Sequence, residues 1–164
     1  LLIFLGIIEN GSPLFRQKRV GINQKIFFLL KFRTMHKNTK STATHLVDFS
    51  KVTPFALFMR STKLDEVPQL FNVLIGDMSI VGPRPLSVLH YERDKAQGNV
   101  TRSLLKGGLL GLGHINKGTS EMGNSIYEYE YVEQYQKRSS FGLLRLDLWI
   151  IWKGIIVILK GGGH

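Results

Sequence analysis

Hydrophobic and polar positions alternate most clearly in the first quarter of the chain. Residues 14–20 and 25–33 are strand-like stretches, and the turn-rich residues 21–24 separate them. Side chains that are two positions apart in a strand share a face. The pattern predicts a β-hairpin, and we expect one polar side of it to carry four cations: Arg16, Lys18, Lys31 and Arg33.

A helical pattern follows at residues 63–75, where apolar residues recur at intervals of three and four. Pro68 is tolerated only in the first turn of a helix, and Gly76 is a natural stop, so the helix is expected to begin near Leu64 or Asp65. Another helix is predicted to begin at Thr53-Pro54. The helix predicted over residues 63–75 has an apolar stripe of four residues: Val67, Leu70, Phe71 and Leu74.

Strongly apolar segments lie near both ends of the sequence. Residues 1–8 rise only about 12 Å as a helix, which is too short to span a bilayer, and they lack the flanks of a signal peptide. They are either the last part of a membrane segment or a buried first element. Residues 141–159 contain Trp149 and Trp152, and they suit either an interfacial helix or a core helix.

The remaining segments give weaker signals. Residues 36–50 are polar and predict an exposed loop. The glycine-rich residues 107–114 suit either a pliable loop that closes over a substrate or a connector, with His114 as a polar loop residue. Three tyrosines spaced four apart would share one helix face, and we expect them to pack against the domain: Tyr127, Tyr131 and Tyr135.

Composition and charge narrow the class of protein. A chain of 164 residues with 43% apolar residues is expected to form one folded domain, and the absence of cysteine excludes disulfides and thiolate zinc sites. The net charge of +10 is uneven, because residues 1–63 contain 11 basic and 2 acidic residues, a net of +9. Such a field favours a polyanion, a phosphorylated ligand or an anionic membrane surface.

An acidic pair beside several cations is the candidate reactive centre. Asp65 and Glu66 follow Arg60 closely, and Arg84 lies between two prolines in the stiff segment 82–85 (GPRP). A guanidinium binds phosphate in bidentate fashion, and Mg²⁺ bridges carboxylates to phosphate oxygens. The combination predicts a metal-assisted phosphoryl-transfer site with Asp65 and Glu66 as metal ligands. The structural alternative is an ordinary acidic helix start and a salt-bridged Arg84.

Four ordered blocks make the sequence similar to a known family. These blocks are residues 15–21 (FRQKRVG), 31–35 (KFRTM), 64–74 (LDEVPQLFNVL) and 76–85 (GDMSIVGPRP). The chain resembles the bacterial sugar transferases, the monotopic polyprenyl-phosphate phosphoglycosyl transferases. The resemblance is close over residues 11–85 and looser as far as residue 160.

The resemblance implies transfer of a sugar-1-phosphate from a nucleotide sugar, usually a UDP-sugar, to polyprenyl phosphate, which starts bacterial surface glycan synthesis. It makes Asp65 the nucleophile of a phosphosugar-aspartyl intermediate. It gives Glu66 a role in metal binding or proton handling, with Mg²⁺ as the cofactor. Four cations would contact substrate phosphate or the active site: Lys31, Arg33, Arg60 and Arg84.

The resemblance also implies an α+β fold, with a small, mainly helical catalytic domain (residues 11–164) and a short β-hairpin. Residues 1–10 would be the remnant of a re-entrant membrane helix, which would place the domain on the cytoplasmic face of the bacterial inner membrane. One block departs from the family pattern Pro-Gly-Ile-Thr-Gly-Leu-Ala-Gln. Here Gly107, Leu110 and His114 stand at the proline, threonine and glutamine positions, which leaves the sugar and the nucleotide open.

Rival functions make different demands on these residues. A nucleic-acid binder would explain the basic segment, but no recognisable binding motif accompanies it, so nucleic acid is not an expected partner. A metal-dependent phosphohydrolase would use similar residues and release sugar phosphate without a lipid. A non-catalytic, membrane-associated homologue is the third alternative. The sequence does not distinguish a monomer from a homo-oligomer.

Overall fold

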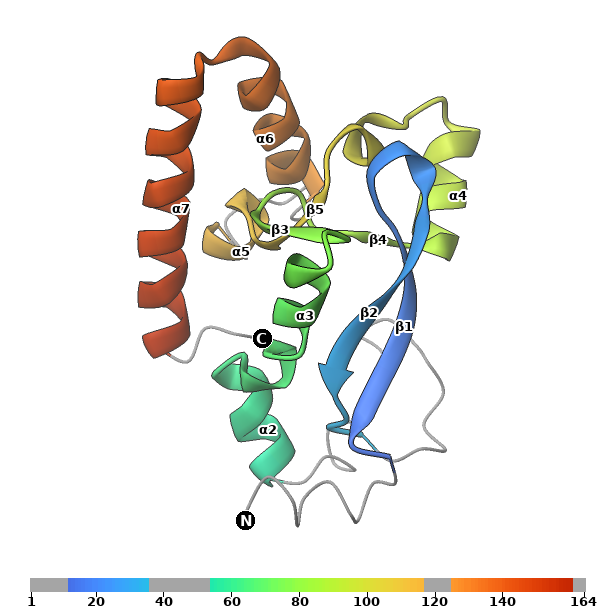
Figure 1. Cartoon of the computed structure of the whole chain (residues 1–164), viewed down its shortest axis with the longest axis vertical. Coiled ribbons are helices and arrows are strands. Elements are labelled where there is room, and N and C mark those ends of the chain that lie inside the picture. The colour runs from blue at the N-terminus through green and yellow to red at the C-terminus, as the bar shows by residue number, and fades with distance from the viewer. Residues whose placement is uncertain (1–11, 36–53, 117–124, 161–164) are drawn as a thin grey trace.

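The computed structural model describes residues 12–35, 54–116 and 125–160 and shows a mixed α+β fold, as predicted (Figure 1). Three strands form an antiparallel sheet in the order β2-β1-β4, and two form a parallel sheet, β3-β5. The strands are β1 (Leu14–Val20), β2 (Ile26–Phe32), β3 (Met78–Val81), β4 (Leu86–Ser87) and β5 (Gly107–Leu110).

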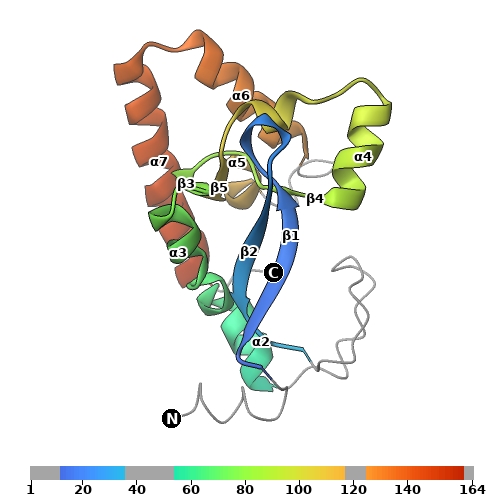
Figure 2. The ribbon, with the colours of Figure 1, turned by 45° about the vertical axis from the view of Figure 1, so that its right-hand side comes forward.

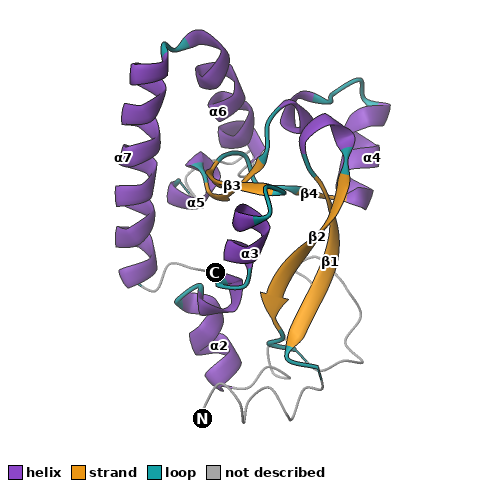
Figure 3. Ribbon diagram, in the orientation of Figure 1, coloured by secondary structure: helices purple, strands orange, loops and turns teal. Residues whose placement is uncertain are grey.

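Helices surround the small parallel sheet, and the long β1–β2 hairpin extends on the side away from α7 (Figures 2 and 3). The α-helices are α2 (Pro54–Ser61), α3 (Gln69–Leu74), α4 (Val88–Ala96), α5 (Leu112–Ile115), α6 (Ser125–Lys137) and α7 (Ser140–Leu159). Short 3-10 helices are η1 (Ile22–Gln24), η4 (Leu64–Glu66) and η5 (Thr101–Leu104). Among the described residues, no helix combines the length and the apolar character needed to cross a bilayer. The predictions for residues 1–10 and 36–50 lie outside the described residues.

The predicted hairpin is confirmed, but its predicted polar side is wrong. The register pairs Arg16 with Leu30, and residues directly opposite in an antiparallel pair share a face. Arg16 and Lys18 therefore lie on the face opposite to Lys31. Arg19 pairs with Phe27, which lies on the same face of β2 as Lys31, so Arg19 lies on the Lys31 face instead. Alternation within each strand was readable from the sequence, whereas the register depends on the 3-10 turn between the strands.

The predicted helix at residues 63–75 is broken into two pieces. Leu64–Glu66 form the 3-10 helix η4, and α3 begins only after Pro68, its N-cap residue. Proline has no backbone N–H, so it stands at the start of α3 and does not continue a helix from η4. Asp65 and Glu66 therefore lie in a separate turn ahead of α3, and the predicted position at an α-helix N-terminus is wrong.

The apolar stripe of this segment is largely exposed. Its exposed fractions are 44% for Val67, 48% for Leu70, 64% for Phe71 and 80% for Leu74. The buried side chains of α3 are instead the polar Gln69 and Asn72. The helix thus turns its polar face towards the domain, which leaves an apolar surface without a partner in the described structure.

Asn72 explains why α3 turns this way. Its side-chain oxygen accepts a hydrogen bond from the Leu30 N–H (3.0 Å), and its amide nitrogen donates to the Phe28 carbonyl (2.8 Å). Because β2 is an edge strand, these backbone groups have no neighbouring strand on this side. Asn72 supplies the missing partner and fixes η4 and α3 against the hairpin, close to Lys31.

A second packing centre joins the last two helices to α5. Ile150 of α7 is fully buried and packs with Leu112 and Tyr131, whose hydroxyl donates to Asp147 at 2.8 Å. The predicted packing of the tyrosines is confirmed for Tyr127 and Tyr131, which belong to this cluster. The predicted helix at residues 141–159 is α7, with one face in this core and exposed apolar side chains elsewhere.

We predict that Asn72→Ala destabilises the domain by about 1–3 kcal/mol, because it leaves a partly buried backbone donor and acceptor of β2 without partners. Urea denaturation followed by circular dichroism measures this loss. Phe71→Ala is the matched control, since Phe71 is the neighbouring residue of α3 and is mostly exposed. An equal loss of stability in both variants would show that the edge contacts of Asn72 contribute nothing special.

Candidate active site

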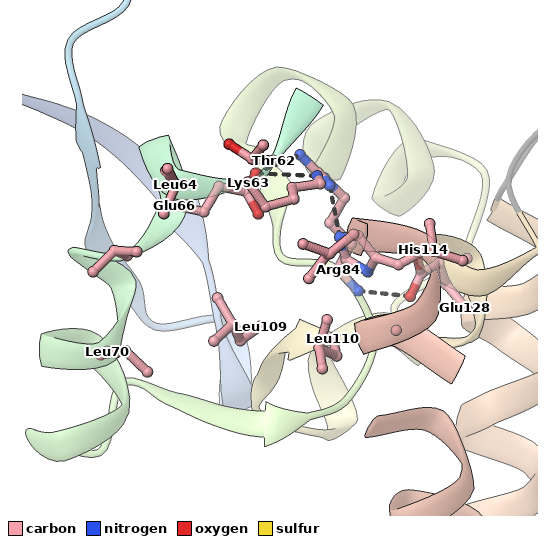
Figure 4. Close-up of a pocket in the computed structure, with 15 residues that line it drawn as sticks. Thr62, Lys63, Leu64, Glu66, Leu70, Arg84, Leu109, Leu110, His114 and Glu128 are labelled. Atoms are coloured by element: carbon pink, nitrogen blue, oxygen red, sulfur yellow. Dashed lines mark hydrogen bonds and ion pairs between the residues drawn. The ribbon is translucent and has the colours of Figure 1, made fainter. Parts of the chain in front are cut away.

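Glu66 is the centre of a buried charge cluster. Its Oε1 atom lies 2.7 Å from the Lys31 ammonium, 3.5 Å from the Lys63 ammonium and 3.7 Å from a guanidinium nitrogen of Arg84. These cations come from the end of β2, from the residue that precedes η4 and from the GPRP segment. Figure 4 shows the last two, Lys63 and Arg84, beside Glu66. The structure thus brings together Lys31, Glu66 and Arg84, three of the six residues singled out in the sequence.

The electrostatics of the cluster favour a permanently ionised Glu66. Burial opposes ionisation of this carboxyl, but the charges of Lys31, Arg84 and Lys63 outweigh it and hold the pKa of Glu66 well below its usual range. Burial lowers the pKa of Lys63 to about 8, although the Glu66 charge opposes this shift. One carboxylate therefore holds three cations together in a partly desolvated place.

Asp65 differs from its neighbour. It is buried, and none of the described residues forms an ion pair or a hydrogen bond with its carboxylate. Burial raises the pKa of Asp65, while the charges of Lys31, Lys63 and Arg60 partly oppose this. Of the two adjacent carboxylates, Asp65 is therefore the one that no described residue engages in an ion pair or a hydrogen bond.

Arg84 is held from four directions (Figure 4). Its backbone N–H donates to Glu128 Oε2 at 2.6 Å, and its carbonyl accepts from Arg102 at 2.6 Å. Its guanidinium donates to His114 Nε2 at 2.9 Å and approaches Glu66. An arginine fixed at both its backbone and its side chain loses little entropy when it binds an oxyanion.

Glu128 and His114 were missed as site residues by the sequence analysis. Glu128 was not singled out in the sequence, but it is buried against the GPRP segment. His114 was expected to be a polar loop residue, but it lies half-buried in the short helix α5. Burial and the neighbouring Arg84 keep its pKa well below the usual value, so the imidazole is neutral. Because arginine is always a donor, Nε2 accepts, and Nδ1–H is buried without a partner.

The sequence had suggested that the glycine-rich residues 107–114 form either a pliable loop or a connector. Both interpretations are wrong. The segment forms strand β5, parallel to β3, and carries the GPRP segment through close backbone contact. Gly82 N–H donates to the Leu110 carbonyl and Gly108 N–H to the Pro83 carbonyl, each at 2.9 Å. A Cβ atom on Gly108 would lie 2.2 Å from the Gly82 nitrogen. Only glycine allows this approach, which brings the backbone of the GPRP segment, and with it Arg84, close to β5.

A cavity of about 290 Å³ lies beside the cluster, between η4–α3, β5 and α7. Its polar end contains side chains of the cluster and its neighbours: Thr62, Lys63, Glu66, Arg84, His114 and Glu128. A far smaller cavity on the other side of Glu66 and Arg84 is lined by Arg19 and Lys31. Asp65 lines neither cavity.

The other predicted phosphate-binding residues lie outside this centre. Arg60 is in the last turn of α2, and its charge offsets a small part of the rise in the pKa of Asp65 that burial causes. Arg33 lies at the open end of the hairpin, where its Nε donates to the Ser12 carbonyl and its guanidinium stacks on Phe15 at 5.5 Å. Arg33 lines neither cavity. Arg19, by contrast, donates to the Pro85 carbonyl at 3.1 Å and supports the GPRP segment.

The residues present fit a Mg²⁺ ion that is held mainly by its substrate. Among residues 12–35, 54–116 and 125–160, no group of three or more histidine, aspartate and glutamate side chains surrounds one point. Mg²⁺ commonly binds one or two carboxylates and completes its shell with phosphate oxygens and water. Asp65, with its uncommitted carboxylate, suits this role best, and Glu66 is largely engaged by cations.

Comparisons with known proteins agree with the four sequence blocks. The family model described as "Bacterial sugar transferase" matches residues 1–161. A UDP-glucose:undecaprenyl-phosphate glucose-1-phosphate transferase of Klebsiella pneumoniae is 38% identical over 154 residues, which are 92% of this chain and 32% of that protein. A UDP-galactose-lipid carrier transferase of Erwinia amylovora is 30% identical, over 98% of this chain and 34% of that protein.

A third relative, from Caulobacter vibrioides, is also named a UDP-glucose:undecaprenyl-phosphate glucose-1-phosphate transferase. It is 33% identical over 98% of this chain and 60% of its own length. The chain spans about a third of the length of the Klebsiella and Erwinia relatives. It belongs to the bacterial sugar transferase family.

We predict that the KM for a UDP-sugar rises roughly tenfold between pH 7 and pH 9.5, because Lys63 is charged only below its pKa of about 8. Above that pH the site loses the charge of one of the three cations that surround Glu66. In Lys63→Arg the charge persists, so this rise should disappear. Steady-state kinetics over this pH range make the measurement, and a rise that persists in Lys63→Arg would assign the titration to another group.

We also predict that His114→Ala lowers kcat/KM for the nucleotide sugar roughly tenfold or more, because Arg84 loses its side-chain acceptor. His114→Gln should keep most of the activity, since an amide oxygen also accepts from a guanidinium. Kinetics that separate kcat from KM, together with thermal unfolding, measure the two variants. A purely structural His114 would give equal losses in both.

Proposed function

We propose that this chain transfers a sugar-1-phosphate from a UDP-sugar to polyprenyl phosphate. Membership of the bacterial sugar transferase family and the names of the relatives, which specify UDP-sugars and undecaprenyl phosphate or a lipid carrier, support this reaction. The observation that carries the proposal is that Asp65, a buried carboxylate with no ion-pair or hydrogen-bond partner among the described residues, adjoins a carboxylate that gathers three cations.

The first step uses Asp65 as the nucleophile. One of its carboxylate oxygens attacks the phosphorus that carries the sugar, and a new oxygen–phosphorus bond forms. The bond between that phosphorus and the bridging oxygen breaks, and UMP leaves with the bridging oxygen and its electron pair. The product on the protein is a phosphosugar-aspartyl intermediate, an acyl phosphate, and its formation divides one difficult displacement into two easier ones.

The second step regenerates the carboxylate. A phosphate oxygen of polyprenyl phosphate attacks the same phosphorus and forms a diphosphate bridge to the sugar. The oxygen–phosphorus bond of the acyl phosphate at Asp65 breaks, and its electron pair returns to the carboxylate. Burial raises the pKa of Asp65, which makes its ionised form more basic than an exposed aspartate and so a better nucleophile.

The cation cluster stabilises the charge that develops on the phosphoryl oxygens. Lys31, Lys63 and Arg84 are held in place by Glu66 before the substrate arrives, so little reorganisation is needed during the reaction. This assigns Glu66 mainly to the positioning of cations and only secondarily to the metal. Mg²⁺, when bound at Asp65 with the substrate diphosphate, would neutralise charge and assist the leaving group.

We further infer that the domain works on the cytoplasmic face of the bacterial inner membrane, where UDP-sugars and the lipid carrier meet. The exposed apolar side chains of α3 and α7 support a membrane-facing surface. On α7 these include Trp152, together with the nearby Lys153, a combination that suits the headgroup region. The lipid-linked product would start the assembly of a bacterial surface glycan.

We predict that Asp65→Asn abolishes turnover, with a loss of at least about 10³-fold in the formation of lipid-linked sugar. The amide is close to the carboxylate in size but cannot act as the nucleophile. The assay follows UMP release and lipid product in detergent with Mg²⁺, undecaprenyl phosphate and UDP-glucose or UDP-galactose. Mass spectrometry of the acid-quenched wild-type reaction should show a phosphosugar on the peptide that contains Asp65.

Glu66→Gln serves as the matched control, because it removes the neighbouring charge but leaves Asp65 in place. It should weaken turnover and still form the adduct. Full activity in Asp65→Asn would refute the nucleophile assignment. Sugar phosphate released in the absence of lipid would instead indicate a phosphohydrolase.

A further inference from the structure

The cavity beside the charge cluster is chemically divided. Away from the charged end, its walls are almost entirely aliphatic, and they come from three separate segments. The aliphatic lining residues are Leu64, Val67 and Leu70 from η4–α3, Leu109 and Leu110 from β5, and Val157 and Ile158 from α7. Figure 4 shows Leu70, Leu109 and Leu110 around this space, with the charged groups at one end.

The charged end suits a phosphate group. Lys63 and Arg84 both line the cavity there. The two carboxylates at this end are already engaged, since Glu66 is paired with cations and Glu128 accepts the Arg84 N–H. An anionic head would therefore meet cations and not free negative charge.

The aliphatic end does not suit a nucleoside or a sugar. Both would need several hydrogen-bond partners, and a wall of leucine, valine and isoleucine offers none. A volume of about 290 Å³ is at the lower limit for pockets that bury a whole drug-sized ligand, roughly 300–1,000 Å³. The space thus fits a short stretch of hydrocarbon next to an anionic head.

The cavity also adjoins apolar surface. Leu70 and Val67 line the cavity and are themselves partly exposed, and Leu74 continues their face along α3 with greater exposure. On α7, Leu159 follows the lining residue Ile158 and is mostly exposed. A long hydrocarbon chain that enters the cavity by one end can therefore leave it over apolar side chains of both helices.

We propose that this cavity binds the phosphate-proximal isoprene units of the lipid acceptor, with the acceptor phosphate at Lys63 and Arg84. The inference rests on the proposed function and adds a place for the acceptor to it. The remaining isoprene units would pass over the exposed faces of α3 and α7 into the bilayer. Leu70 and Ile158 are then specificity-determining residues for the lipid and not for the nucleotide sugar.

Matched pairs of variants test this placement. Leu70→Gln alters the cavity, whereas Leu89→Gln makes the same change at an exposed residue of α4, outside the cavity and away from α3 and α7. Ile158→Gln is paired in the same way with Ile126→Gln on α6. Each purified full chain is assayed in detergent micelles for the KM of undecaprenyl phosphate and for the first-turnover burst of UMP without lipid. Native mass spectrometry measures retained undecaprenyl phosphate independently of turnover.

We expect Leu70→Gln and Ile158→Gln to raise the KM for undecaprenyl phosphate roughly five- to tenfold, because an amide replaces hydrocarbon against the isoprene units. Both should retain less lipid and keep the UMP burst. The two control variants should stay within about twofold of the unsubstituted protein. Leu70 is partly exposed and Leu89 is mostly exposed, so thermal unfolding should be similar for Leu70→Gln and Leu89→Gln.

Two results would overturn the proposal. An unchanged KM and unchanged lipid retention in the cavity variants, or equal changes in the control variants, would place the lipid elsewhere. A diminished UMP burst with an unchanged KM for lipid would assign the cavity to the nucleotide sugar. Failure of the proposed function is distinct: the unsubstituted protein would then give no UMP burst and no lipid product, whatever lipid it retained.

Discussion

The attraction between the Glu66 carboxylate and three cations is the interaction on which the site depends. Lys31, Lys63 and Arg84 belong to three segments that are far apart in sequence, and they would repel one another without a shared anion. Burial makes that attraction stronger than it would be in water, and it also makes the loss of any partner costly. The fold therefore has to place each segment accurately, and hydrogen bonds to backbone groups help to hold the segments in position.

Much of the architecture was readable from the sequence, because the hairpin, α2 and α7 each have a clear local pattern. The ordered motifs also led to the acidic pair and to Arg84. Longer-range relations were not readable. The register of the hairpin put Arg19, and not Arg16, on the face of Lys31, and no periodicity within a strand encodes that choice.

The outward direction of the apolar face of α3 could not be read from the sequence for a related reason. A stripe at helical spacing normally marks the buried side, but here Asn72 completes the edge of β2 and takes the inner position. His114 and Glu128 were missed because each acts through Arg84, from α5 and α6, and no short motif contains them. A buried polar residue acquires its role from its neighbours in space, and these are known only from coordinates.

The backbone of Lys63 limits how the turn before η4 can change. The backbone of Lys63 adopts a left-handed conformation, with φ of 60°, that residues other than glycine rarely adopt. This conformation costs on the order of 1 kcal/mol or more. Glycine would relieve this cost but would remove the ammonium group that faces Glu66. Selection for thermal stability and selection for charge at this position thus pull in opposite directions, and the chain keeps the charge.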